Sequence, residues 1–267
     1  MSKIVIIGAG NLGTSLAKGL VKSNYSDPSD FTLTRRRLSR ISSLEDEGYN
    51  ITSDNNSAVK NAEIIVLAIL PQKLNDVLDD IKPNISNQLI ISLVSGATIY
   101  QIQERIDNKN IPIVRAMPNT AIAIGESMTC IASKAEHKDK LPLVKDIFNK
   151  VGESIIINEE QMTSATALCA CGIAFFLRAI RAASQGGNEI DFHSGEALKM
   201  AAQTAKGAAS LLLANNSHPE DEIDKVTSPK GCTIAGLNQM EHHGFSSAFI
   251  KGITTSAEKA GNLYEEN

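Results

Sequence analysis

Aromatic residues are scarce in this chain and its net charge is small, and both features argue against a protein that binds nucleic acid. Only 4 % of the 267 residues are aromatic and none is tryptophan, so few rings are present on which single-stranded bases could stack. The formal net charge is −4, whereas proteins that bind the phosphate backbone carry a basic surface. We therefore expect no nucleic-acid partner.

Long apolar runs and paired cysteines are also missing. The longest apolar runs, such as residues 64–70, fall far short of the ~20 residues that a membrane helix needs. The apolar run at the N-terminus ends at Gly8, which is too early for a signal peptide. None of the four cysteines forms a CxxC pair or has a histidine at metal-ligand spacing. We expect a cytoplasmic protein with reduced thiols, no bound metal and no membrane partner.

The first 158 residues alternate short, β-branched apolar runs with stretches of helical length. Runs that are apolar on both faces and separated by helices are typical of a parallel sheet covered on both sides. The expected strands are residues 3–7, 31–34, 64–68, 89–92, 111–114 and 154–157, and the helices between them include 11–21, 73–81 and 138–151. This pattern predicts an α/β domain over residues 1–158.

From residue 159 onward, small and helix-forming residues prevail and no strand is expected. Eighteen alanines lie in this part, and long helices are predicted over residues 161–184, 194–215 and 245–263. A stripe of alanines would let helix axes approach closely at a helix–helix or subunit interface, although an alanine-rich surface helix has the same composition. The stripe comprises Ala201, Ala202, Ala205, Ala208 and Ala209. The sequence predicts an all-α domain over residues 159–267.

A glycine-rich loop follows the first strand. Its pattern is G-x-G-x-x-G, with a buried strand before it and an amphipathic helix after it, which is the context of a dinucleotide-binding turn. Gly8 would allow the tight turn, Gly10 the approach of a pyrophosphate, and Gly13 close helix packing. The alternative is a strand-to-helix turn without a ligand. The predicted cofactor-binding residues here are Gly8, Ala9, Gly10, Asn11, Leu12 and Gly13.

The end of the second strand indicates which dinucleotide binds. A cofactor with a free ribose 2′-hydroxyl usually meets an Asp or Glu there, but this chain has Thr34, Arg35, Arg36 and Arg37, with no carboxylate before Glu45. A hydroxyl and guanidinium groups would bind a 2′-phosphate. We therefore predict NADP(H) in preference to NAD(H), with Thr34, Arg35 and Arg36 as ligands. Alternatively, the arginines, Arg37 above all, begin a solvated helix.

Four further segments carry a resemblance to one family. They are residues 67–72 (LAILPQ), 114–120 (VRAMPNT), 201–208 (AAQTAKGA) and 226–236 (VTSPKGCTIAG). With them the chain resembles the pyrroline-5-carboxylate reductases, which make L-proline by NADPH-dependent reduction of the cyclic imine 1-pyrroline-5-carboxylate. The resemblance implies an N-terminal Rossmann-type parallel-sheet domain followed by an all-α dimerisation domain, and a homodimer or higher homo-oligomer.

The resemblance also implies roles for individual residues. Asn55 and the turn Ala68, Ile69, Leu70 and Pro71 would contact the cofactor. The loop with Ser228, Gly231, Cys232 and Thr233 would hold the carboxylate of the imino-acid substrate, and Asn119 would belong to the same site. The Thr233 hydroxyl is the group carried over as catalytic. The alternative for Thr233 is a helix N-cap with no part in binding.

The chain departs from the family pattern at several positions. Leu70 replaces a lysine, Ala121 a proline, and Cys232 a threonine, while residues 169–173 read CACGI in place of SGSGP. Lys230 replaces a glycine, which is tolerable if its φ is negative or if the strain is offset elsewhere.

No His–carboxylate pair or catalytic lysine lies within a motif, and reduction of a protonated imine can proceed without one because the imine is already electrophilic. We expect the pair His242–His243 to be solvated. A β-hydroxyacid dehydrogenase would carry a Lys and an Asn in the helix at 168–181, where this chain has neither. A reductase of another imine or of a deazaflavin, and an NADP-binding paralogue without catalysis, remain as alternatives.

Overall fold

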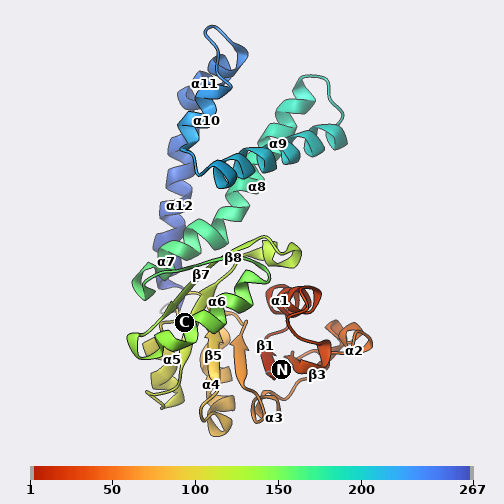
Figure 1. Ribbon diagram of the computed structural model, residues 1–267, viewed down its shortest axis with the longest axis vertical. Coiled ribbons are helices and arrows are strands. Elements are labelled where there is room, and N and C mark those ends of the chain that lie inside the picture. Colours follow the sequence, from red (N-terminus) through yellow and green to blue (C-terminus); the bar gives the residue numbers. More distant parts are fainter. Residues whose placement is uncertain (1–2, 265–267) are drawn as a thin grey trace. The chain divides into compact units, whose positions relative to one another are not determined.

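The structure is a computed structural model that describes residues 3–264. One eight-stranded sheet lies among the helices of its N-terminal part (Figure 1). The strand order is β3-β2-β1-β4-β5-β6-β7-β8, and neighbouring strands are parallel except for β6 and β7. The chain leaves β1 to one side toward β2 and returns on the other side as β4, which makes the carboxyl ends of β1 and β4 the expected place for a ligand. The strands are β1 Ile4–Ile7, β2 Phe31–Thr34, β3 Asn50–Thr52, β4 Ile64–Leu67, β5 Leu89–Ser92, β6 Ile113–Met117, β7 Ser127–Ser133 and β8 Gly152–Ile156.

Apolar side chains fill a separate core on each face of the sheet. Ile6 of β1 packs in one core with Leu16 of α1, and its neighbour Val5 packs in the other core with Leu74 of α4. Successive side chains of a strand point to opposite faces, so a strand that is buried on both faces must be apolar throughout. The helices of this part are α1 Asn11–Lys22, α2 Ser43–Asp46, α3 Asn55–Val59, α4 Leu74–Ile81, α5 Ile99–Ile106 and α6 Leu141–Asn149.

The predicted Rossmann-type α/β fold is confirmed, but two of its strands, β3 and β7, were not predicted from the sequence. β3 has three residues and lies at the edge of the sheet, where it is only partly buried. β7 contains serine, threonine and cysteine among its apolar residues, so its sequence lacks the apolar run of the other strands. It pairs antiparallel with β6, which runs over Ile113–Met117 and therefore extends beyond the predicted 111–114.

The remaining elements are helical. They are α7 Met162–Ala165, a π-helical turn Thr166–Cys171, α8 Gly172–Glu189, α9 Ser194–Asn215, α10 Pro219–Lys225, α11 Cys232–His242 and α12 Phe245–Asn262. The chain divides into two compact units, one ending at Cys171 and rejoined from Ser256 onward, the other spanning Gly172–Thr255. In the second unit α8 packs against α9, where Gly187 faces the buried Ala197. The domain boundary at residue 158 stays a prediction.

The second unit exposes much apolar surface. Leu213 on α9 is 86 % exposed and Phe176 and Leu177 on α8 are each 57 % exposed. The helical stretch Glu159–Glu189 is long and apolar enough to cross a membrane by length and composition. This property was not predicted from the sequence, because polar residues interrupt the apolar runs of this stretch. Helices that are covered by a partner protein have the same composition, so the absence of a membrane partner stays a prediction.

Candidate active site

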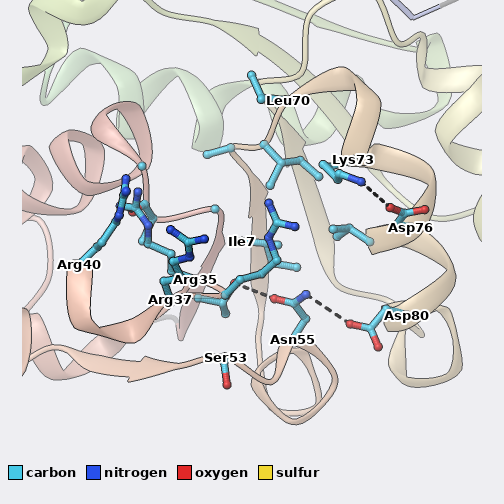
Figure 2. A pocket seen from close by; sticks show the side chains of 18 residues that line it. Ile7, Arg35, Arg37, Arg40, Ser53, Asn55, Leu70, Lys73, Asp76 and Asp80 are labelled. Carbon is cyan, nitrogen blue, oxygen red and sulfur yellow. Dashed lines mark hydrogen bonds and ion pairs between the residues drawn. The ribbon is translucent and has the colours of Figure 1, made fainter. Parts of the chain in front are cut away.

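A groove of about 790 Å³ lies at the carboxyl ends of β1, β2 and β4, beside α4 (Figure 2). Ten of the predicted cofactor residues line it: Gly8, Ala9, Gly10, Thr34, Arg35, Arg36, Asn55, Ala68, Ile69 and Leu70. The other four predicted residues, Asn11, Leu12, Gly13 and Pro71, are outside the lining. The groove is also lined by Ile7, Arg37, Arg40, Ser53, Lys73, Asp76, Val77 and Asp80.

The glycine loop has the geometry of a diphosphate cradle. Gly8 has φ +99°, and a Cβ there would lie 2.6 Å from Ile69 Cγ2, so only glycine fits. At Gly10 a Cβ would meet no atom closer than 4.0 Å, so this glycine leaves bare backbone facing open space rather than filling a packed position. A Cβ at Gly13 would lie 2.9 Å from Ile6 Cγ2, which shows that this glycine allows the close packing of α1 on β1.

The same loop begins α1 without a side-chain cap. Gly10 is the N-cap residue and offers no side-chain acceptor, so the first-turn N–H groups of α1 can donate to a ligand. These donors and the positive end of the helix dipole favour a bound phosphate group. The residues present therefore fit the diphosphate of a dinucleotide.

Basic side chains gather at the β2 end of the groove. Arg35 is partly buried and its Nη1 donates to the Ala9 carbonyl over 2.7 Å, so this arginine also holds the glycine loop. Arg36, Arg37 and Arg40 are exposed and extend the positive charge. The Thr34 hydroxyl donates to Asn55 Oδ1 over 2.7 Å, so its proton is engaged within the protein.

Acidic side chains lie on the opposite wall, on α4. Asp80 accepts from Asn55 Nδ2 at 3.3 Å, and Asp76 pairs with Lys73 at 3.1 Å (Figure 2). Asp80 also accepts from Asn56 Nδ2 at 2.7 Å. The two walls therefore differ in charge, and an anionic group is favoured at the arginine end. Sequence reasoning missed Ser53 because it follows β3, the edge strand that was not predicted.

Asn119 joins two segments of the first unit. Its Nδ2 donates to the Cys169 carbonyl at 3.1 Å on the π-helical turn, and its Oδ1 accepts from Ala121 N at 3.0 Å. Its own backbone N–H donates to Ser127 Oγ at 3.0 Å. The predicted substrate residue thus fixes the turn after β6 against the π-helical turn.

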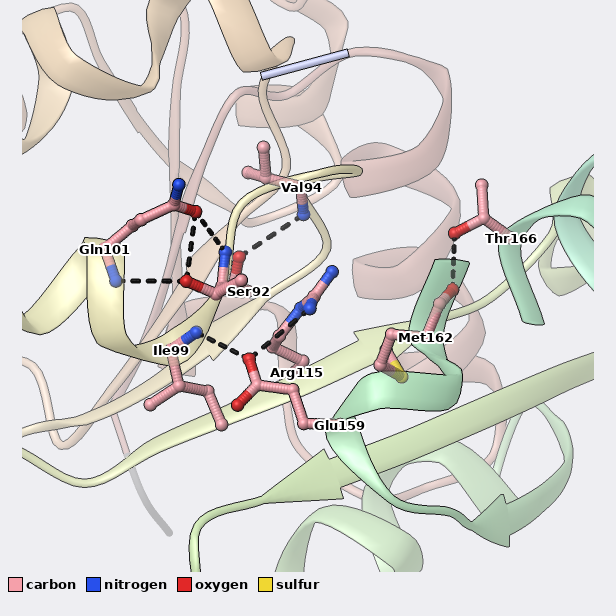
Figure 3. Close-up of polar contacts among 9 residues, drawn as sticks. Ser92, Val94, Ile99, Gln101, Arg115, Glu159, Met162 and Thr166 are labelled. Carbon is pink, nitrogen blue, oxygen red and sulfur yellow. Dashed lines mark hydrogen bonds and ion pairs between the residues drawn. The ribbon is translucent and has the colours of Figure 1, made fainter. Parts of the chain in front are cut away.

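An ion pair joins β6 to the start of the helical region (Figure 3). Arg115 on β6 is 4 % exposed, and its Nη1 lies 3.4 Å from Glu159 Oε1. The same oxygen accepts from the backbone N–H of Ile99 at 2.6 Å, at the start of α5. Burial lowers the pKa of Arg115, and Arg115 Nε has no hydrogen-bond partner among the residues that the structure describes. Glu159 therefore holds together β6, α5 and the start of the helical region.

The predicted substrate loop belongs to the other unit. Gly231 is the N-cap residue of α11, and its N–H donates to the Ser228 carbonyl at 2.9 Å in a tight turn. Thr233 lies inside the helix and is exposed, which contradicts the alternative that it is the N-cap residue. Within residues 3–264 no hydrogen bond from the Thr233 hydroxyl is found, and no side chain caps α11. The first-turn N–H groups of α11 are thus open to an anion.

Lys230 adopts the left-handed conformation, with φ +60°. A negative φ, one of the two conditions under which a lysine is tolerable here, is therefore not met, and the left-handed residue costs the loop about 1 kcal/mol or more of conformational strain. His242 and His243 are exposed at the end of α11, as expected. Among the described residues no group of three His, Cys, Asp or Glu could hold a metal ion.

Comparison with known proteins gives matches over both parts of the chain. A family model described as pyrroline-5-carboxylate reductase dimerisation matches residues 159–263, and one described as NADP oxidoreductase coenzyme F420-dependent matches residues 3–96. Pyrroline-5-carboxylate reductase 2 of Dictyostelium discoideum is 50 % identical over 96 % of this chain and 91 % of its own. Pyrroline-5-carboxylate reductase 1 of the same organism is 55 % identical over 98 % of this chain, which spans only 50 % of that protein's length.

Solved structures show the same architecture. The Plasmodium falciparum pyrroline carboxylate reductase with NADP bound superposes with a TM-score of 0.90 at 26 % identity, covering 98 % of each chain. The pyrroline-5-carboxylate reductase of Coxiella burnetii superposes with a TM-score of 0.88 at 30 % identity, again over 98 % of each chain.

Proposed function

The chain belongs to the pyrroline-5-carboxylate reductase family, and we propose that it reduces 1-pyrroline-5-carboxylate to L-proline, the last step of proline biosynthesis, with NADPH. The observation that carries the proposal is the groove at β1 and β4, where a bare glycine loop meets a cluster of arginines. The named relatives match both the sheet part and the helical part, so a β-hydroxyacid dehydrogenase is not favoured.

NADPH would lie along this groove and, when bound, supplies the hydride for the reduction. The backbone of Gly8–Gly10 and the first turn of α1 would hold its diphosphate. Arg35 and Arg36 would bind the 2′-phosphate of the cofactor, with the exposed Arg37 and Arg40 adding attraction. The buried Thr34, whose hydroxyl proton Asn55 accepts, would line the site without donating to the phosphate. The absence of a carboxylate at the end of β2 supports a preference for NADPH over NADH.

The substrate would be an imino acid held by its carboxylate. In the loop Ser228–Thr233, the uncapped N–H groups of Cys232 and Thr233 and the Thr233 hydroxyl form a donor set for that carboxylate. Lys230, an exposed residue of the same loop, adds a positive charge to it. A protonated imine is already electrophilic, so its reduction requires no general acid from the protein. The protein's contribution is to fix the orientation of the imine and to exclude water.

The helical unit supports a homodimer or higher homo-oligomer. Its match to the dimerisation model covers residues 159–263, and apolar side chains such as Leu213 and Phe176 are exposed on it. Contiguous apolar patches on a single chain mark contact surfaces. We propose that a second copy of the chain covers this surface.

The test is oxidation of NADPH followed by its absorbance, with pyrroline-5-carboxylate as substrate. We expect turnover that requires the imine, and a smaller kcat/KM with NADH. A cyclic imino acid with a six-membered ring serves as a comparison substrate with NADPH. A β-hydroxyacid is tested with NADP+, because its oxidation would reduce the cofactor and raise the same absorbance. Fluorescence titration reports NADPH binding separately. A protein that binds NADPH but turns over no imine would be the catalytically inactive paralogue.

A further inference from the structure

Two cysteines from distant parts of the sequence lie side by side in the first unit. Cys130 Sγ on β7 is 3.8 Å from Cys169 Sγ on the π-helical turn Thr166–Cys171. Cys130 is 5 % exposed and packs with Met117, Ala132 and Met162 in a small core, against which the partly exposed Cys169 also packs. No step of the proposed reaction uses these thiols.

The two thiols differ in reactivity. Either thiol can donate the hydrogen bond that joins the two sulfur atoms. The contact lowers the pKa of Cys169 to about 7, while the same contact and, to a smaller extent, burial raise the pKa of Cys130. The thiolate is the form that reacts with oxidants, so Cys169 would carry the nucleophile at neutral pH, with Cys130 behind it as a thiol. A reactive, accessible cysteine next to a second thiol is the usual arrangement of a reversible oxidation site.

We propose that Cys130 and Cys169 form a reversible disulfide when the protein meets a hydroperoxide. The Cys169 thiolate attacks one peroxide oxygen and displaces hydroxide, which takes up a proton to become water, and Cys169 is left as a sulfenic acid. The Cys130 sulfur then attacks the Cys169 sulfur and gives up its proton to the leaving hydroxide, so the S–O bond breaks and a second water leaves. In total two thiols lose two electrons and hydrogen peroxide is reduced to two waters.

The disulfide would disturb the site through Asn119. The sulfur atoms must approach from 3.8 Å to about 2 Å, which pulls the π-helical turn toward β7. The carbonyl of the same Cys169 accepts the side-chain N–H of Asn119, and Cys130 pairs with Met117 two residues before Asn119. We therefore expect oxidation to slow turnover while NADPH binding is kept, a consequence that rests on the proposed function.

The cross-link itself is tested by mass spectrometry of the full-length protein treated with hydrogen peroxide. Trypsin places Cys130 in peptide 116–134 and both Cys169 and Cys171 in peptide 151–178. We expect these two peptides to be joined in the wild type and in Cys171→Ser, the matched control from the same turn, and not in Cys130→Ser. Wild-type protein in which Cys169 is oxidised without linkage, or is joined to Cys171, would overturn the proposal.

The effect on activity is measured on the same samples. Oxidised wild type should lose turnover by ~tenfold or more, since small misplacements at an active site have effects of this size, and should regain it with dithiothreitol. In Cys130→Ser, Cys169 should advance to sulfinic acid, and dithiothreitol should not restore activity. Full activity of the cross-linked wild type would refute the link to the site. A chain that turns over no imine would fail as a reductase while the mass measurement still decides the disulfide.

Discussion

Truncation of Glu159 should destabilise the sheet unit severely, because it leaves a buried cation without its partner. Arg115 is 4 % exposed. Glu159 Oε1 accepts hydrogen bonds both from the Arg115 guanidinium and from the backbone N–H of Ile99. Removing one partner of a buried ion pair costs about 3–5 kcal/mol. Glu159 is itself 21 % exposed, so water can partly replace it and the lower end of that range applies.

We expect Glu159→Ala to lower the free energy of unfolding by roughly 3 kcal/mol, and the Tm by ~6–12 °C for a chain of this size. The assay is urea unfolding followed by circular dichroism, with a thermal scan of the same preparation. Glu159→Gln should lose less, because its side-chain oxygen can still accept from Ile99.

The matched control is Glu47→Ala. Glu47 pairs with Lys18 at 2.7 Å, but both side chains are more than 40 % exposed, so its loss should cost ~0–1 kcal/mol. If Glu159→Ala proved no more costly than Glu47→Ala, Arg115 would not depend on Glu159 and the reasoning from burial would be wrong.

Four other predictions concern the cofactor, the substrate loop, the assembly and the reactive thiol. Arg35→Asp should weaken the binding of NADPH more than tenfold relative to that of NADH, as measured by fluorescence titration, because a charge-assisted bond of ~1.5–3 kcal/mol becomes a repulsion. An equal loss of affinity for both cofactors would mean that Arg35 serves only to hold the Ala9 carbonyl. Thr233→Ala should lower kcat/KM roughly ten- to hundredfold while NADPH affinity and Tm are kept, because Thr233 is not the cap of α11; an unchanged kcat/KM would remove Thr233 from the site. Light scattering should return at least twice the chain mass of 28.6 kDa, and the monomer mass would contradict assembly through the helical unit. Alkylation of Cys169 by iodoacetamide should accelerate as pH rises through about 7, because the hydrogen bond with Cys130 favours the Cys169 thiolate. An acceleration centred on the ordinary pKa of a thiol would show that this hydrogen bond is absent in solution.

The elements that position the cofactor were predictable because their signals are local. The strand 4–7, the glycine turn and the start of α1 follow each other within a few residues, and each glycine of the pattern has the geometric role expected of it. Two of the three predicted long helices follow from periodicity and composition, since the helix over 194–215 coincides with α9 and the helix over 245–263 matches α12 to within one residue. The predicted helix over 161–184 is instead interrupted by the π-helical turn Thr166–Cys171 and continues as α8 to Glu189.

The contacts that connect distant segments were not predictable. Arg115 and Glu159 are 44 residues apart and Cys130 and Cys169 are 39 apart, so no spacing rule brings them together. β7 was missed because its burial comes from pairing with β6 and β8 rather than from an apolar run. The positive φ of Lys230 runs against the usual preference of a non-glycine residue, and only the glycine that the family has at this position pointed to it.

The most direct measurement of the central claim is the fate of the hydride. The protein is incubated with pyrroline-5-carboxylate and with NADPH in which deuterium replaces both hydrogens on carbon 4 of the nicotinamide ring. The proline formed is then analysed by mass spectrometry. We predict one deuterium per proline, on the ring carbon that was the imine carbon, with an equal amount of oxidised cofactor. Oxidation of NADPH without labelled proline, or no turnover by protein that binds NADPH, would contradict the assignment.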